Sequence, residues 1–318
     1  MSARFITVRT GARLHFGPLS YRPERGRHFG GVGLMIDRPG VHAVVGLAKP
    51  GTSGSSNSAR VRALLDTLKR SGVCGSSHFD VDVLEEIPPH SGLGSGTQLA
   101  LAVTDAILTL QGHKHPPQSL ALISGRGDRS AIGLFGYEQG GFLIDAGRAN
   151  NQDVGALATR VSFPAEWRVL LVRPIDGQGL HGSVEMSAFQ SLPSMSEQLT
   201  GRLCRLALTE LLPALQQNDF AAFTSALYEY GQLAGEFFAP SQGGVFASTA
   251  IRRLAASLSG PATGMAQSSW GPTVALFAEG NGPARDLWQQ IKSHPDGANL
   301  HVEQVQARNR GRELTSSV

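Results

Sequence analysis

The chain has 318 residues, of which 41% are hydrophobic and 17% are charged, and its formal net charge is +3. This length allows one large domain or two closely packed ones. The weak net charge gives little reason to expect nucleic-acid binding and suits an anionic small molecule equally well. No apolar run reaches the roughly 18 residues that a membrane span needs.

Cysteine content and the start of the chain set the expected compartment. Only Cys74 and Cys204 occur, far apart and without a CxxC pattern, so neither a disulfide framework nor a thiolate zinc site is expected. The first residues, MSARFITVRTGARLHFG, lack the apolar core of a secretory signal. We therefore expect a cytoplasmic protein with small-molecule substrates, no nucleic-acid partner and no membrane association.

The first half of the chain alternates strand-like and helix-like patterns. β-Branched or alternating segments predict strands at 5–9, 41–47, 78–84 and 140–146. Helical spacing of apolar residues predicts helices from Val61 to a stop at Gly72, over 99–110, and over 118–136 with interruptions at Gly125 and Gly127. The Gly/Arg/His-rich segment 26–40 is predicted to connect two strands, and 50–58 to form a flexible loop.

The second half has the pattern of a known supersecondary unit. The predicted order is a strand at 167–173, helices near 196–216, 219–237 and 245–258, strands at 264–269 and 272–278, a helix near 283–293 and a strand near 298–305. This is the order of a split βαβ, ferredoxin-like unit. From Ala307 onward the chain is predicted to fray.

The segment IPPHSGLGSGTQLALAV, residues 87–103, places a Gly/Ser-rich loop directly before a helix. Unpaired N–H groups and the dipole at a helix start bind phosphate, and glycines let the backbone approach an anion. No GK[ST] follows and the GxGxxG spacing is missing, so this is neither a Walker A nor a dinucleotide loop. The predicted phosphate-binding residues are Ser91, Gly92, Gly94, Ser95, Gly96 and Thr97.

PPHSGLGSGTQLA resembles the second motif of the GHMP kinase superfamily. TGARLHFG at 10–17 and GMAQSSWGPTVALF at 264–277 lie where that superfamily has its first and third motifs. The resemblance implies an α+β, two-domain fold. Residues 1–160 would form an N-terminal substrate- and phosphate-binding domain like the second domain of ribosomal protein S5, and residues 161–318 a ferredoxin-like domain.

Two departures from the kinase pattern argue against phosphoryl transfer. The segment in which kinases of this superfamily carry an Asp–Asn or Asp–Gln pair contains Asp128 between Arg126 and Arg129, without the pair. The third motif, a run of glycines in the kinases, contains Trp270 and Pro272, which do not reproduce a bare glycine loop.

Five blocks together are similar to a non-kinase branch of the superfamily, the beta-ribofuranosylaminobenzene 5'-phosphate synthases. They are GRHFGGVGLMIDRPG, IPPHSGLGSGTQLALAV, RSAIGLFGYEQGGFLIDAG, PSQGGVF and GMAQSSWGPTV. The resemblance implies a decarboxylating transferase of tetrahydromethanopterin biosynthesis. It would join 4-aminobenzoate to 5-phosphoribosyl 1-diphosphate, release CO₂ and diphosphate, use Mg²⁺ and act as a homodimer.

This chemistry assigns roles to residues outside the Gly/Ser loop. The predicted catalytic residues are Arg129, Glu138, His15 and His28. Substrate contacts are predicted for Arg13, Arg126, Gln242, Gln267, Ser268, Ser269 and Trp270. Asp37 is the predicted metal ligand, with Glu138 and Asp145 as alternatives. An ordinary structural role is the alternative interpretation for each of these residues. Two other functions also stay open: an ATP-dependent small-molecule kinase and a non-catalytic ligand-binding protein.

Overall fold

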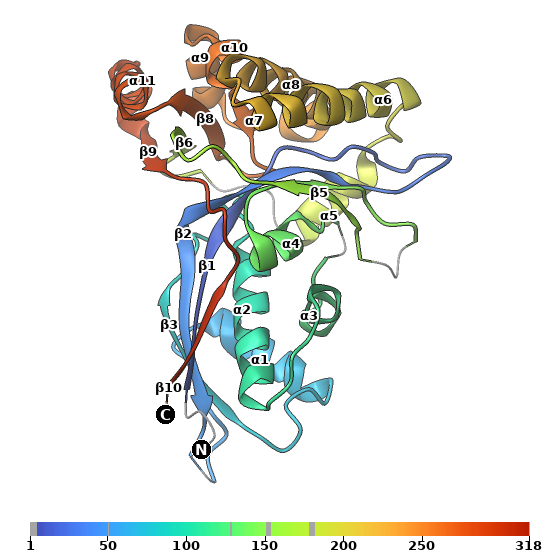
Figure 1. Cartoon of the computed structure of the whole chain (residues 1–318), viewed down its shortest axis with the longest axis vertical. Helices are drawn as coiled ribbons and strands as arrows, with labels where there is room; N and C mark the ends of the chain where they lie inside the picture. Colours follow the sequence, from blue (N-terminus) through green and yellow to red (C-terminus); the bar gives the residue numbers. More distant parts are fainter. Residues whose placement is uncertain (1–4, 50, 128, 151–153, 178–181, 318) are drawn as a thin grey trace.

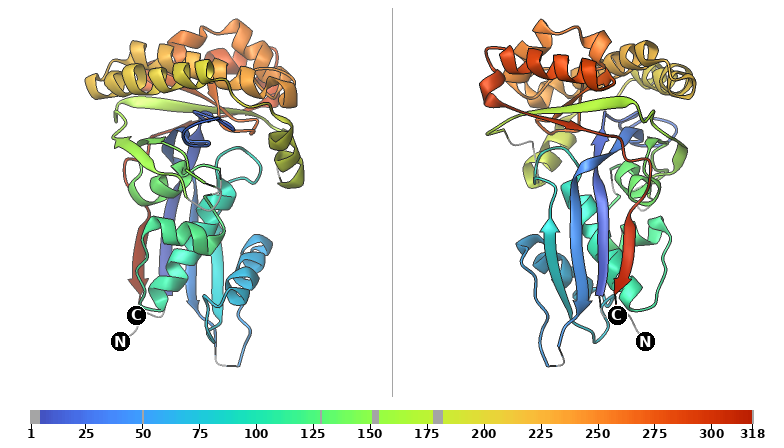
Figure 2. Two further views of the ribbon diagram at one scale, coloured as in Figure 1. Left: turned by 90° about the vertical axis from the view of Figure 1, so that its right-hand side faces the viewer. Right: turned by 60° about the vertical axis from the view of Figure 1, so that its left-hand side comes forward.

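The computed structural model describes residues 5–49, 51–127, 129–150, 154–177 and 182–317, with the backbone alone for 182–186. Two sheets organise this part of the chain (Figure 1). The first sheet is extended and carries helices on one face. The second lies across its end, beneath a layer of helices (Figure 2).

The first sheet is antiparallel, in the order β10-β1-β2-β4-β5 with β3 paired to β2. Its strands are β1 (Phe5–His15), β2 (Gly31–Leu47), β3 (Phe79–Glu85), β4 (Phe142–Asp145), β5 (Leu157–Val161) and β10 (Glu313–Ser317). Its helices are α1 (Ala59–Arg70), α2 (Ser95–Leu110), α3 (Pro117–Ser124) and α4 (Ile132–Gln139). In α2, every residue from Gln98 to Leu108 is buried, because the sheet, α3 and α4 surround it.

The second sheet has the antiparallel order β7-β8-β6-β9, which is the ferredoxin-like arrangement that the element order predicts. Its strands are β6 (Trp167–Pro174), β7 (Ala266–Gln267), β8 (Val274–Glu279) and β9 (Leu300–Val305). The helices are α5 (Gly182–Ser191), α6 (Glu197–Arg205), a π-helical turn (Leu206–Leu211), α7 (Leu212–Gln217), α8 (Phe220–Gln242), α9 (Thr249–Ser257), α10 (Gly260–Thr263), α11 (Asn281–Ser293) and a 3₁₀ turn (Gly297–Asn299).

Several predicted boundaries were wrong. The segment 26–40 is not simply a connection, because β2 begins at Gly31 and its first half pairs with Ala12–His15 of β1. Only Ala266–Gln267 of the predicted strand 264–269 is extended, and a tight turn follows. The C-terminal end does not fray, since β10 pairs with β1 over five residue pairs. Strand β5 and helix α5 were not predicted at all.

The hydrophobic core is continuous from one sheet to the other. Phe223 of α8 packs edge-to-face against Phe142 of β4, at 6.1 Å between ring centroids, and against Phe277 of β8, at 5.4 Å. Phe163 lies between β5 and β6 and contacts both Phe223 and Phe277. Rings of this size contribute much of the buried apolar area. The division of the chain into two domains near residue 160 stays a prediction. Strand β10 comes from the C-terminal part of the chain and belongs to the first sheet.

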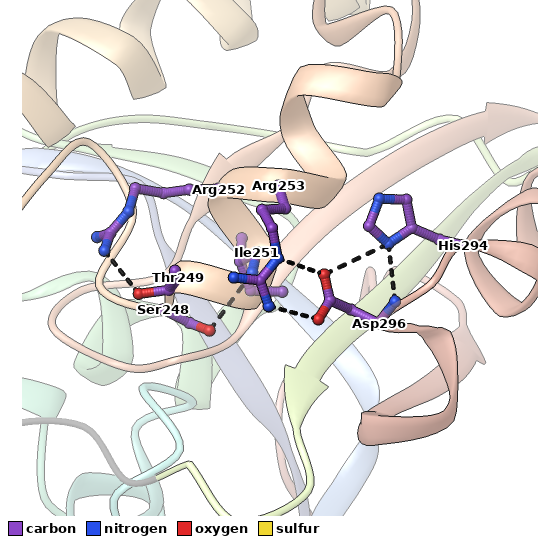
Figure 3. A network of polar contacts seen from close by, with 7 residues as sticks. All are labelled: Ser248, Thr249, Ile251, Arg252, Arg253, His294 and Asp296. Carbon is purple, nitrogen blue, oxygen red and sulfur yellow. Dashed lines mark hydrogen bonds and ion pairs between the residues drawn. The ribbon is translucent and has the colours of Figure 1, made fainter.

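A polar network fixes α9 to the turn after α11 (Figure 3). Arg253 donates from Nε to one carboxylate oxygen of Asp296, at 2.8 Å, and from Nη2 to the other. His294 Nδ1 accepts a hydrogen bond from the Asp296 N–H at 3.1 Å. Ser248 caps α9 by accepting from the Ile251 N–H. These contacts brace the outer helices behind the second sheet.

Among the described residues, no helix is long and apolar enough to cross a membrane.

Candidate functional site

The Gly/Ser loop lies between the two sheets and is held by both. Arg13 of β1 bonds to it twice: its backbone N–H donates to Leu93 O at 3.1 Å, and its Nη1 donates to Gly92 O at 2.8 Å. Ser268, after β7, donates from its hydroxyl to the same Gly92 oxygen at 2.8 Å and accepts from the His15 N–H at 3.1 Å. The three sequence motifs therefore meet at one place.

Two glycines of the loop are required by its shape. Gly94, the residue before α2, has φ 75°, and a Cβ there would lie 2.7 Å from Arg13 Cγ. Gly92 has φ 82°, and a Cβ there would lie 2.4 Å from Ser268 O. Both conformations belong to the left-handed region that favours glycine. The loop thus brings backbone and arginine close together at the start of α2.

A cavity of about 150 Å³, partly open to solvent, lies beside the start of α2. The residues lining it come from both halves of the chain. They are Arg13, His15, Pro18, Phe29, Thr97, Gly125, Arg126, Gly127, Arg129, Ser130, Phe189, Phe238, Ser269 and Trp270. The lining therefore combines arginines and glycine backbone with aromatic rings.

We call the three arginines of the lining, together with Thr97, the cationic side of the pocket; the arginines are Arg13, Arg126 and Arg129. None of the described residues that line the pocket is acidic. Burial, and then the nearby guanidinium groups of Arg13 and Arg129, lower the pKa of His15 from 6.5 to about 3. Its imidazole is therefore neutral at physiological pH, and the cations of this side are arginines. Such a surface suits a phosphate or carboxylate.

The aromatic side of the pocket comprises Phe29, Phe189, Phe238 and Trp270. Trp270 is 3% exposed, and its ring centroid lies 4.5 Å from that of Phe238 and 5.0 Å from that of Phe189. Phe29 and Ser269, both in the pocket wall, adopt left-handed φ values of 65° and 54°. Non-glycine residues held in that region concentrate at functional sites, where surrounding structure enforces the strain.

The structure gathers about half of the predicted site residues around this pocket. Those lining it are Arg13, His15, Thr97, Arg126, Arg129, Ser269 and Trp270. Gly92, Gly94, Gly96 and Ser268 form the loop or its support. Two loop hydroxyls already have protein partners: Ser91 donates to Pro88 O at 2.7 Å, and Ser95 accepts from Arg60 at 3.3 Å.

Other predicted residues do not line the pocket. Gln267 donates to Gln242 and to Ser269 O and accepts from the Ala247 N–H, while Gln242 donates to Gly244 O and Val245 O. The two amides therefore brace the turn after α8. His28 Nδ1 accepts from the Arg22 N–H at 2.9 Å, and its ring packs on Phe29 at 3.9 Å between centroids. Its contact with the site is through Phe29.

The predicted acids also lie elsewhere. Asp37 accepts from the Gln306 N–H at 2.9 Å and joins β2 to the chain after β9. Glu138, near the end of α4, has its carbonyl against Gly311. Asp145 is fully buried, accepting from the N–H groups of Ala131 and Gly147; burial raises its pKa. Asp128 lies outside the described residues. Their catalytic and metal-binding roles stay predictions without geometric support.

A magnesium site made of protein groups does not fit the pocket. In the part of the chain that the structure describes, no three His, Cys, Asp or Glu side chains cluster in a way that could hold a metal. Asp145 already uses both carboxylate oxygens on backbone N–H groups. Mg²⁺ commonly binds proteins through one or two carboxylates together with substrate phosphates. Among the described residues, the pocket lining contains arginines and no carboxylate.

Sequence analysis missed much of the aromatic wall. Phe189 sits on α5, which no periodicity predicted, and Phe29 lies in a segment taken as a connection. Phe238, at 4% exposure, is both buried in the core and part of the wall. No local pattern marks these residues, because the fold brings them together from distant segments.

Comparison with known proteins identifies the class that this fold and site define. Residues 58–137 match the model of the GHMP kinases N terminal domain. The homoserine kinase of Cytophaga hutchinsonii is similar in structure, with a TM-score of 0.71 at 16% identity over 99% of this chain and 98% of that one. The mevalonate diphosphate decarboxylase of Staphylococcus aureus has a TM-score of 0.66 at 12% identity, over 98% of each chain. The α+β GHMP fold predicted from sequence is thereby confirmed.

Curated relatives narrow the class to one family. The beta-ribofuranosylphenol 5'-phosphate synthase of Methanothermobacter thermautotrophicus is 30% identical over 292 residues, covering 85% of this chain and 87% of the relative. The synthase of the same name from Archaeoglobus fulgidus is 27% identical over 97% of this chain and 99% of the relative. The chain belongs to the beta-ribofuranosylphenol 5'-phosphate synthase family, which confirms the predicted family and that the protein is an enzyme.

Proposed function

We propose that this enzyme joins C1 of 5-phosphoribosyl 1-diphosphate to the carboxylate-bearing ring carbon of a para-substituted benzoate. The observation that carries the proposal is the pocket lining: three arginines and four aromatic rings border one cavity beside the start of α2. Phosphates suit the cationic side and a flat aromatic acid suits the aromatic side. The curated relatives, named beta-ribofuranosylphenol 5'-phosphate synthases, support a product that combines both parts.

The chemistry requires no acid in the pocket. The bond from C1 to the diphosphate oxygen breaks, and its electron pair leaves with diphosphate. The ring carbon that bears the carboxylate forms the new C–C bond, with electron density supplied by the para substituent. The bond to the carboxylate then breaks, CO₂ departs, and its electron pair restores the aromatic ring. No net proton transfer, oxidant or reductant is needed.

The residues of the cationic side would act on the leaving diphosphate. Arg13 and Arg126 flank the start of α2, where Thr97 and the glycine-rich backbone add hydrogen-bond donors. Preorganised cations that meet charge as it develops stabilise a transition state without reorganising. Neutral His15 would supply hydrogen bonding rather than charge. Mg²⁺ would neutralise diphosphate oxygens; it is proposed to arrive on the donor, since the described residues form no cage for it.

The acceptor is predicted to be 4-aminobenzoate, and the relatives' name points to the 4-hydroxy compound. Both share the carboxylate and the ring and differ in the para substituent. The proposed product with 4-aminobenzoate is 4-(beta-D-ribofuranosyl)aminobenzene 5'-phosphate, for tetrahydromethanopterin biosynthesis. The homodimer that the family resemblance implies, and the cytoplasmic location expected from the cysteine content and the start of the chain, belong to the same proposal.

Release of labelled CO₂ tests this function directly. Purified enzyme is incubated with 5-phosphoribosyl 1-diphosphate, Mg²⁺ and either carboxyl-labelled 4-aminobenzoate or carboxyl-labelled 4-hydroxybenzoate. We expect labelled CO₂ and an equal amount of diphosphate with at least one acceptor. Absence of both products, together with ATP-dependent phosphorylation of a small alcohol, would instead identify a kinase. Neither activity, with tight metabolite binding, would identify a non-catalytic member.

A further inference from the structure

Four aromatic rings from four distant segments form a corner in the pocket. Phe29 precedes β2, Phe189 lies on α5, Phe238 on α8, and Trp270 between β7 and β8. The Phe189 ring is nearly perpendicular to the other three: 86° to Phe29, 88° to Phe238 and 85° to Trp270, at centroid distances of 6.0, 6.0 and 5.0 Å. A flat ligand ring that stacks on one of these side chains would meet another of the four edge-on.

This corner suits an aromatic ligand better than a sugar. Aromatic pairs favour offset-stacked and edge-to-face arrangements, and perpendicular walls offer both at once. The corner is also costly to build, because Phe29 is held at φ 65°, in a region where bulky residues are rare. Buried apolar rings beside a cluster of arginines therefore indicate a ligand with an aromatic part and an anionic part.

Arg129 lies at the border between the two sides. Its guanidinium carbon lies over the face of the Phe189 ring, 5.3 Å from the ring centroid, and Arg129 lines the same cavity. A guanidinium fork matches a carboxylate geometrically and electrostatically. An aromatic acid that packs against Phe189 would therefore place its carboxylate at Arg129, toward the phosphate-binding side.

We propose that Phe29, Phe189, Phe238 and Trp270 form the acceptor subsite, in which Phe189 is the stacking wall for the benzoate ring and Arg129 receives its carboxylate. This inference rests on the proposed function and adds the placement of the acceptor. It orients the carboxylate-bearing carbon toward C1 of the donor. The apolar corner also keeps water away from C1 once diphosphate begins to leave.

Two leucine substitutions at neighbouring phenylalanines test the subsite. Phe189→Leu keeps apolar volume but removes the flat ring. Phe237→Leu is the matched control: Phe237 belongs to the same aromatic cluster, contacting Tyr21 and Phe238, but does not line the pocket. Loss of an aromatic contact of about 1.4 kcal/mol corresponds to a tenfold weaker interaction. We expect Phe189→Leu to raise KM for the acceptor about tenfold, with donor KM within about twofold of wild type and Phe237→Leu unchanged.

A ring-preserving variant and a binding measurement complete the experiment. Phe189→Tyr is expected to keep acceptor KM within a few-fold of wild type. Calorimetric titration of 4-aminobenzoate and of 4-hydroxybenzoate into wild-type and Phe189→Leu enzyme, with inorganic diphosphate present, is expected to show the same loss of affinity without turnover. Equal shifts in both KM values, or none in either, would overturn the subsite. A wild type that binds the acceptor through Phe189 yet releases no CO₂ would refute the function while supporting the subsite.

Discussion

His15 shows how the neighbours of one side chain set its charge. It lies between Arg13 and Arg129 and is 8% exposed, and these surroundings lower its pKa to about 3. The pocket therefore contains an uncharged imidazole, and the cations among its described lining residues are arginines. A neighbouring side chain also determines the residue type at position 94, because a Cβ there would lie against the Arg13 side chain.

The pKa of His15 predicts a pH-dependent stability. Between the unfolded pKa near 6.5 and the folded pKa of about 3, the unfolded chain binds a proton that the folded protein does not. Stability from this group is therefore complete above pH 6.5 and is lost as pH falls toward 3. We expect the free energy of unfolding to drop by about 1.4 kcal/mol per pH unit through this one residue between pH 6 and 4.

Urea denaturation at a series of pH values measures that slope. His15→Asn should reduce the slope of the free energy of unfolding against pH by the contribution of about one proton. An unaltered slope in His15→Asn would show that His15 is protonated in the folded protein.

Gly94→Val is predicted to weaken donor binding through Arg13. The new side chain would lie against Arg13 Cγ, displacing the guanidinium that bonds to Gly92 O, and would strain a backbone at φ 75°. We expect the KM for 5-phosphoribosyl 1-diphosphate to rise about tenfold, equivalent to about 1.4 kcal/mol. Steady-state kinetics measures the change.

The variant Gly72→Val separates the effect of backbone strain from the effect of contact with Arg13. Gly72, just after α1, also has a left-handed φ of 79°, but a Cβ at this position would have no atom within 4 Å of it. Both variants should lose stability, and only Gly94→Val should change donor KM. Equal donor KM values in the two variants would show that the Gly94 backbone does not contribute to donor binding.

At the scale of elements, the C-terminal strand is tied to the interior by a buried ion pair. Arg312, just before β10, donates from Nε to Asp105 of α2 at 3.1 Å, and the Tyr137 hydroxyl donates to the same oxygen at 2.9 Å. The Asp105 side chain is 8% exposed. Removing one partner of a buried pair leaves the other without compensation, at a cost of about 3 kcal/mol or more.

Arg312→Ala is therefore expected to lower the free energy of unfolding by about 3 kcal/mol. Arg310→Ala provides the comparison, because Arg310 pairs with Glu313 at the surface with 74% of its side chain exposed. An exposed pair contributes at most about 1 kcal/mol. Urea denaturation of both variants measures the difference. Equal losses of unfolding free energy would contradict a larger contribution from the Arg312–Asp105 ion pair than from the exposed pair.

The elements that sequence predicted share strong local patterns, and those it missed do not. Amphipathic spacing placed α1, α2 and α8, and strand-like runs placed the first half of β1 and most of β6 and β8. Strand β10, ELTSS, has little apolar content and forms because β1 offers an open edge. The Gly/Ser loop before α2 was predictable because its residues are contiguous. The aromatic corner was not, because it exists only after four segments have packed together.

At the scale of the whole molecule, the two sheets are expected to unfold together. One hydrophobic cluster contains residues of both, and β10 links the end of the chain to the first sheet. We predict a single thermal transition by differential scanning calorimetry, with equal calorimetric and van't Hoff enthalpies. Two separated transitions would show that the sheets are independent domains despite these contacts.

The pairing of β1 with β10 also places the first and last described residues of the chain side by side, with Phe5 opposite Ser317 (Figure 1). Neighbouring termini are the condition under which a protein tolerates circular permutation. A short peptide could join them, and new termini could be opened in the exposed loop at 51–53. The three motifs would then follow one another in a different order along the chain, while the pocket they build would be the same.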